Sequence, residues 1–171
     1  MMDRIRVLLA DDHVMVRQGI RHFLEDAGDV EVVAEAEDGA AALRLVEAQQ
    51  PDVAVLDIHM PQVTGVEATR QIKERFPQVR VLILTAYDDD PYVFALLQAG
   101  ADGYVLKTAS GDELVQAVRT VHQGGTMLSP AIAAKVVRQV ATRRPQQAAD
   151  QVEPLSGREL DVLRLAAQGM T

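Results

Sequence analysis

Short apolar segments alternate with segments of helical spacing along the first 125 residues, and this alternation constrains the fold more than any other feature. Near-continuous apolar runs of four to eight residues are typical of strands buried on both faces, as in a parallel sheet covered by helices. The segments of this kind are Ile5–Ala10, Val30–Glu35, which is the weakest, Val53–Ile58, Val79–Thr85 and Gly103–Leu106.

The segments between these strands repeat apolar residues at intervals of three and four, the spacing of amphipathic helices. Asp90-Pro91 has the form of a helix start, and Ala99-Gly100 has that of a helix stop. Strict alternation predicts a doubly wound α/β domain with a five-stranded parallel sheet over residues 1–125. The predicted helices are Val14–Ala27, Ala40–Gln49, Glu67–Phe76, Pro91–Ala99 and Asp112–His122.

After residue 125 the pattern changes. Ser129-Pro130 begins a single predicted helix that ends near Val140, and the polar residues Thr142–Pro154 favour a linker. We therefore expect residues 126–154 to form a linker with one helix. Ser156–Glu159 has the spacing of a capping box, which predicts a further helix that ends at Gly169.

Charge and composition limit the partners. Residues 1–125 hold 21 acidic and 11 basic residues, whereas residues 126–171 hold 4 acidic and 6 basic ones. DNA affinity depends on Lys and Arg, so the first part is a poor DNA-binding surface. Cysteine is absent, which excludes disulfides and thiolate metal sites. We expect a cytoplasmic protein without a membrane partner, because no signal pattern and no apolar run of about 20 residues occurs.

Polar side chains follow four of the predicted strands at the point where each strand ends. Asp11 and Asp12 follow the first strand, Asp57 and Thr85 close the third and fourth, and Lys107 follows the fifth. Ligands of open parallel sheets bind beyond the carboxyl ends of the strands. One such acid alone is usually a helix cap, but their convergence on one edge favours a site. Close carboxylates need a cation to remain ionised together, and oxygen ligands favour Mg²⁺.

The motifs that carry these residues resemble the receiver domains of two-component response regulators. They are Val-Leu-Leu-Ala-Asp-Asp at 7–12, Leu-Asp-Ile-His-Met-Pro at 56–61 with Gly65, Leu-Thr-Ala at 84–86 and Gly-Tyr-Val-Leu-Lys at 103–107. Leu-Ser-Gly-Arg-Glu at 155–159 resembles the opening of a LuxR-type helix-turn-helix. Together they indicate the NarL/FixJ subfamily of transcription factors, with a flavodoxin-like receiver and an incomplete DNA-binding module at residues 155–171.

The resemblance implies a role for each acid at the site. Asp57 is the expected phosphoacceptor, which takes a phosphoryl group from a sensor histidine kinase. Asp12 and Asp57 are expected to bind Mg²⁺ through their carboxylates, Asp11 chiefly through water, and His59 through its backbone carbonyl. The phosphorylation and dephosphorylation would be self-catalysed and Mg²⁺-dependent, so the resemblance implies a phosphoacceptor rather than an enzyme.

The resemblance also implies how phosphorylation changes the conformation and assembly of the protein. Lys107 and Thr85 are expected to contact phosphoryl oxygens, and Tyr104 to turn toward the space that Thr85 vacates. His59 and Tyr87 are expected to tune the lifetime of the phosphoryl group. Phosphorylation is expected to favour a homodimer, through the face of the first and fifth helices or that of the fourth helix and fifth strand. It would control DNA binding and transcription by the full-length protein, whereas these 171 residues alone are not expected to bind operator DNA.

One departure and two alternatives remain. Many receivers have a cis proline after the lysine, whereas this chain has Thr108, which predicts a trans bond or a strained loop. A phosphatase of the haloacid dehalogenase type also uses an aspartate nucleophile, but carries an Asp-x-Asp pair after its first strand, whereas Asp11 and Asp12 are adjacent. A single-domain relay protein is the other alternative.

Overall fold

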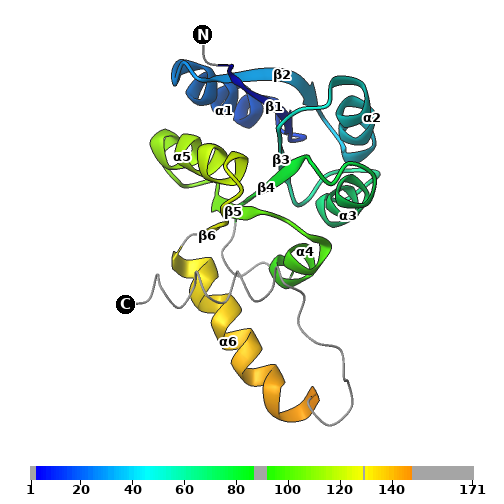
Figure 1. The fold of residues 1–171 in the computed structure, drawn as a ribbon, viewed down its shortest axis with the longest axis vertical. Helices are drawn as coiled ribbons and strands as arrows, with labels where there is room; N and C mark the ends of the chain where they lie inside the picture. The colour runs from blue at the N-terminus through cyan, green and yellow to red at the C-terminus, as the bar shows by residue number, and fades with distance from the viewer. Residues whose placement is uncertain (1–2, 87–91, 129, 148–171) are drawn as a thin grey trace.

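The computed structural model describes residues 3–86, 92–128 and 130–147, which form one parallel sheet with helices on both faces (Figure 1). The strand order is β2-β1-β3-β4-β5-β6. The strands are β1 Ile5–Ala10, β2 Val30–Ala36, β3 Val53–Asp57, β4 Arg80–Thr85, β5 Gly103–Leu106 and β6 Met127–Leu128. The helices are α1 Val14–Asp26, α2 Gly39–Gln49, α3 Gly65–Arg75, α4 Val93–Ala99, α5 Gly111–His122 and α6 Pro130–Gln147.

The two faces of the sheet carry separate cores. Residues of α1 and α5 pack on one face, around Leu24 and Val118, and those of α2, α3 and α4 pack on the other, around Val46, Ile72 and Leu96. Figure 1 shows the two groups of helices on opposite sides of the strands. Because β3 is covered on both faces, all five of its residues are buried. The predicted doubly wound α/β fold is confirmed.

The prediction of five strands is wrong, because the described residues contain a sixth. Met127 and Leu128 pair in parallel with Gly103 and Tyr104 and so extend the sheet beyond β5. Two residues are too few to show a periodic pattern, and the preceding Gly124-Gly125 is typical of a loop. The sheet therefore ends at residue 128 rather than at residue 106.

The prediction of a linker from Thr142 is wrong for residues 142–147, which belong to α6. Residues 142–147, Thr-Arg-Arg-Pro-Gln-Gln, lack an apolar stripe, and Pro145 is disfavoured inside a helix. Their Arg and Gln residues have high helix propensity, however, and they continue a helix that is already nucleated. Residues 148–171 lie outside the described part of the chain, and the rest of the linker and the helix-turn-helix at 155–171 lie there with them. Within the described ranges, no helix combines the length and the apolar character needed to cross a membrane.

Helix ends follow capping chemistry more closely than apolar spacing. Thr64 caps α3 by accepting from the Glu67 N–H at 3.3 Å, so this helix begins two residues before the predicted Glu67. The predicted stop at Gly100 is confirmed, since this residue has a left-handed backbone with φ of 104°. The predicted start at Asp90-Pro91 lies outside the described residues. The described part of the chain has no cis peptide bond, so the bond before Thr108 is trans.

Candidate functional site

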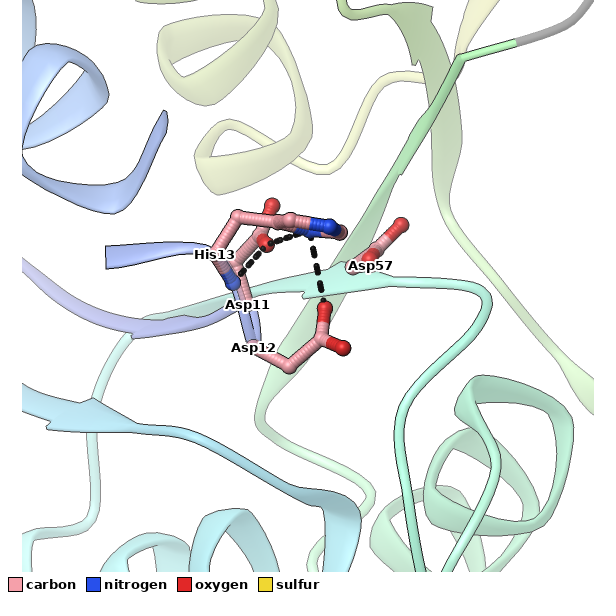
Figure 2. A group of neighbouring side chains, drawn as sticks. All are labelled: Asp11, Asp12, His13 and Asp57. Carbon is pink, nitrogen blue, oxygen red and sulfur yellow. Dashed lines mark hydrogen bonds and ion pairs between the residues drawn. The ribbon is translucent and has the colours of Figure 1, made fainter. Parts of the chain in front are cut away.

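Parallel pairing brings the ends of β1, β3, β4 and β5 to one edge of the sheet. Ala10 pairs with Leu56, which places Asp11 beside Asp57, and Thr85 pairs with Leu106, directly before Lys107. Figure 2 shows Asp11, Asp12 and Asp57 gathered at this edge. Ligand atoms of Asp11, Asp12, His13 and Asp57 all lie within 4.8 Å of one another. The structure therefore brings together the acids that the sequence predicts to meet, and they form a cluster that could hold a metal ion.

The three carboxylates differ in their contact with solvent. Asp11 and Asp57 are buried, with exposed fractions of 0% and 5%, whereas the side chain of Asp12 is about one third exposed. The Asp11 Oδ1 accepts a hydrogen bond from the backbone N–H of His13 at 2.8 Å. The Asp11 Oδ2 is buried and accepts no hydrogen bond of good geometry among the described residues, although the ammonium of Lys107 lies 2.8 Å away. The negative charge on this oxygen of Asp11 is therefore compensated mainly by the ammonium of Lys107.

Lys107 joins the two buried acids. Its Nζ lies 2.8 Å from Asp11 Oδ2 and 3.4 Å from Asp57 Oδ1, so it is closer to Asp11 than to the predicted phosphoacceptor. The backbone N–H of Lys107 donates to the carbonyl of Thr85 at 2.7 Å, which fixes its position across the edge of the sheet. Burial by itself lowers the pKa of this ammonium, but the contacts with Asp11 and Asp57 outweigh burial, and its pKa lies above the usual value.

For Asp57, burial outweighs the attraction of Lys107 in setting the pKa of the carboxyl. Burial raises the pKa of its carboxyl, and the nearby charges of Asp11 and Asp12 raise it further. The ammonium of Lys107 lowers this pKa but does not cancel the increase. One cation among three carboxylates leaves the edge with excess negative charge, which is the condition under which a bound divalent cation would lower the energy of the site.

Gly65 allows the loop after β3 to fold back against Asp57. Its N–H donates to the carbonyl of Ile58 at 2.9 Å, and a Cβ at this position would lie 2.6 Å from the carbonyl oxygen of Asp57. Any larger residue would push the loop away from the strand end. The glycine that accompanies the 56–61 motif is therefore needed for close backbone approach.

Thr85 and Tyr104 lie on adjacent buried strands. Thr85 is 1% exposed and Tyr104 is fully buried, and the hydroxyl of Tyr104 donates to the carbonyl of Val93 at 2.8 Å. This hydrogen bond connects β5 to the first residue of α4. Tyr104 on β5 therefore holds the first turn of α4, the helix that follows Thr85 in the chain.

Of the two residues expected to tune the lifetime of the phosphoryl group, the structure describes only His59. His59 is exposed, and its ring packs edge to face against Tyr92, with centroids 5.6 Å apart. His59 therefore lies beside the beginning of α4. Tyr87 lies outside the described residues.

His13 makes contacts at the site that the strand-end pattern does not predict. His13 is the N-cap residue of α1, and its Nδ1 lies 3.2 Å from Asp11 Oδ1 and 3.0 Å from Asp12 Oδ1. Arg17 is a further missed residue, since its Nη1 donates to the carbonyl of Asp11 at 2.6 Å. The adjacency of His13 to the acid pair was the available signal.

The fold and the edge define a class of protein: a doubly wound α/β domain with buried acids and a lysine at the carboxyl ends of its strands. Residues 7–119 match the response regulator receiver domain family. The chain belongs to this family.

Two regulatory proteins and one solved response regulator are similar to this chain. The chain is 41% identical over 169 residues to the oxygen regulatory protein NreC of Staphylococcus carnosus. This match covers 96% of this chain and 78% of that protein. It is 38% identical over 180 residues to the transcriptional regulatory protein DegU of Brevibacillus brevis, covering 98% of this chain and 76% of that protein. A two-component response regulator of the LuxR family from Aurantimonas sp. SI85-9A1 has a similar structure, with a TM-score of 0.76 and 37% identity over 81% of this chain and 99% of that one. The resemblance to NarL/FixJ regulators is confirmed, and the chain is a receiver of this signalling class rather than a dehalogenase-type phosphatase.

Proposed function

We propose that residues 1–125 act as a receiver unit whose Asp57 accepts a phosphoryl group from the phosphohistidine of a sensor kinase. The observation that carries this proposal is the position of Asp57 at the end of β3, buried beside Lys107 and within the acidic cluster. By this proposal the Asp57 carboxylate attacks phosphorus. A P–O bond forms, the P–N bond to the kinase histidine breaks, and the electron pair remains on the histidine nitrogen.

The proposed cofactor is Mg²⁺, and the residues present fit it. The donors are carboxylate oxygens, the ligand type that Mg²⁺ prefers, and Asp11 offers a buried oxygen without a hydrogen bond of good geometry. Asp12 and Asp57 would bind the ion directly, Asp11 through water, and the backbone carbonyl of His59 would complete the set. When bound, Mg²⁺ neutralises negative charge between Asp57 and the incoming phosphoryl oxygens.

The chain's own residues would supply the remaining steps. The ammonium of Lys107 is a compact cation suited to a phosphoryl oxygen, and the hydroxyl of Thr85 would donate to another. Movement of Thr85 and Tyr104 would then alter the hydrogen bond to Val93 and the position of α4. This local change would bias a two-state element that controls DNA binding and transcription by the full-length protein, which acts in the cytoplasm beside kinase and DNA.

Acetyl phosphate with Mg²⁺ tests the proposal. We expect one stable phosphoryl adduct per chain, located on Asp57 by peptide mass spectrometry, with release of one acetate per adduct. Phosphorylation should be self-catalysed and should stop when a chelator removes the metal. Rapid multiple turnover without accumulated adduct would instead support a phosphatase, and an adduct elsewhere would refute the role of Asp57.

We propose that His59 and Tyr87 tune the lifetime of this adduct by controlling the access of water. The position of His59 beside Tyr92, at the start of α4, supports a role at the rim of the site. Replacing both His59 and Tyr87 with alanine should change the dephosphorylation rate by about tenfold, which corresponds to about 1.4 kcal/mol in the barrier to hydrolysis. The measurement is the decay of the purified adduct, and an unchanged rate would eliminate this role.

For the phosphorylated homodimer we propose the face formed by α1 and α5. Among the described residues, Val14, Met15, Val16 and Phe23 of α1 are exposed large apolar side chains, and Met15 is 82% exposed. Of these four, Phe23 also lines a cavity of about 340 Å³, together with Val115 of α5. Exposed apolar surface of this kind is typical of interaction sites.

Met15→Glu should therefore weaken the dimer formed with beryllofluoride, a phosphoryl mimic, by about tenfold or more, because it places a charge within an apolar contact. Sedimentation measures the dimer constant. Tyr92→Ser is the matched control, since Tyr92 is exposed on the α4 side. If Tyr92→Ser disrupts the dimer and Met15→Glu does not, the α4 face is the interface.

A further inference from the structure

We propose that His13 is a nitrogen ligand of the cation site at the carboxyl edge, and that it extends the ions accepted there from Mg²⁺ to divalent ions that bind imidazole, such as Co²⁺ and Zn²⁺. The inference rests on the proposed function in that it assumes a cation site formed by Asp11, Asp12 and Asp57. The inference goes beyond that function because it adds His13 to the carboxylate ligands and makes His13 the residue that determines which divalent ions bind.

The ring of His13 has the spacing of a ligand relative to two carboxylates. His13 Nδ1 lies 3.0 Å from Asp12 Oδ1 and is hydrogen bonded to Asp11 Oδ1 at 3.2 Å, so a bound ion would take the place of the proton between the ring and the carboxylates. Two neighbouring ligand atoms on one octahedral ion with bonds of about 2.1 Å are separated by about 3.0 Å. The imidazole nitrogen and the Asp12 oxygen are therefore already spaced like two ligands of one ion, and Asp11 Oδ1 lies close enough to act through water, as in the proposed Mg²⁺ site. Figure 2 shows the ring of His13 across this group, on the side of Asp57.

The backbone of His13 holds the ring near the acids. His13 is the N-cap of α1 with an extended backbone, and its own N–H donates to Asp11 Oδ1 at 2.8 Å. The backbone is therefore tied to the carboxylate that the ring also contacts. The side chain is 66% exposed, so an ion could reach the nitrogen from solvent without any change in the core.

The cluster also leaves one oxygen without a hydrogen bond of good geometry. Asp11 Oδ2 is buried, and among the described residues its close partner is the ammonium of Lys107, which also contacts Asp57. A buried carboxylate oxygen with this surplus of negative charge around it favours a bound cation.

The chemistry of the donors determines which cation is affected. Carboxylate and water ligands suit Mg²⁺, whereas imidazole suits Zn²⁺, Ni²⁺ and related ions and adds little for Mg²⁺. His13 should thus contribute to binding of Co²⁺ and Zn²⁺ and hardly affect binding of Mg²⁺. Because the carboxylates are shared, excess Mg²⁺ should displace Co²⁺ from the same site.

Cobalt titration of the whole chain tests the inference, with calorimetry for affinity and visible absorption for the ligand field. His13→Asn is the test variant, because asparagine is a good N-cap and preserves the start of α1. We expect its Co²⁺ affinity to fall by about tenfold or more, with a changed visible spectrum, and its Mg²⁺ affinity to change by less than about threefold. His22→Asn is the matched control, since His22 lies on α1 with its ring against Phe23.

The outcomes separate this inference from the proposed function. If His13→Asn binds Co²⁺ with wild-type affinity and spectrum, or if His22→Asn produces the loss, the inference is overturned while Mg²⁺ binding and the Asp57 adduct stand. If neither Mg²⁺ nor Co²⁺ binds the wild-type chain, the proposed cation site itself fails. Circular dichroism of each variant confirms that a loss of binding does not come from unfolding.

Discussion

Asp57→Asn eliminates the adduct with acetyl phosphate and stabilises the protein in metal-free buffer, according to the charges at the carboxyl edge. The amide has no nucleophilic carboxylate oxygen, so no acyl phosphate forms. It also removes one buried charge from the neighbourhood of Asp11 and Asp12. We expect the free energy of unfolding at neutral pH to rise by about 1 kcal/mol, the usual size of a single-residue effect, which corresponds to about 2–4 °C in Tm.

The stability that Asp57→Asn gains over the wild type should increase with pH. Because burial raises the pKa of Asp57, the folded chain binds this proton more tightly than the unfolded chain does. Stability due to Asp57 is therefore lost as the pH rises from the ordinary carboxyl pKa of about 4 through the raised value, and the loss is complete above it. Asp57→Asn lacks this loss, so its advantage over the wild type should grow across that window and then become constant.

Urea denaturation at several pH values in the presence of a chelator measures both effects. Asp12→Asn is a graded control, because Asp12 is more exposed and should yield a smaller gain. Added Mg²⁺ should reverse the order, since it stabilises the ionised wild-type site. A variant at position 57 that is less stable than the wild type without metal would contradict the repulsion on which this prediction depends.

Much of the site can be predicted from the sequence because parallel strands share one direction. Once Asp57 and Lys107 are assigned to strand ends, the register of β3, β4 and β5 brings them to one edge without any knowledge of side-chain conformation. Features that depend on backbone topology alone are therefore predictable. The closer contact of Lys107 with Asp11 than with Asp57 is not, because it depends on side-chain torsions.

Side-chain contacts between distant segments are equally hard to predict at the amino ends of the strands, opposite the site. Asp102 is fully buried, accepts from the Val81 N–H at 2.8 Å and contacts Lys73 Nζ at 3.0 Å, across 29 residues of sequence. Nothing in the local pattern distinguishes Asp102 from a solvated turn residue. The two-residue β6 was missed for a related reason, since its strand conformation comes from pairing with Gly103 and Tyr104 rather than from its own composition.

Lys107→Met should produce the largest loss of stability of any substitution at the site. It retains most of the side-chain length but leaves the buried carboxylates of Asp11 and Asp57 without their cation. Removing one partner of a buried ion pair costs about 3–5 kcal/mol, because the remaining charge is uncompensated. Urea denaturation without metal should show a loss of this size. A second substitution, Asp11→Asn, should recover part of it, because it removes one of the stranded charges.

Lys73→Met is the control that separates loss of a buried lysine from loss of charge balance at the site. Lys73 and Lys107 are equally exposed at 17%, and each contacts a buried aspartate, but Lys73 pairs with Asp102 at the opposite edge. Both variants should be destabilised. Mg²⁺ should restore stability to Lys107→Met alone, since a divalent ion among Asp11, Asp12 and Asp57 replaces the missing positive charge, whereas Asp102 has no such cluster around it in the described part of the chain. Equal rescue of both variants, or none of either, would mean that repulsion among these carboxylates does not govern the carboxyl edge.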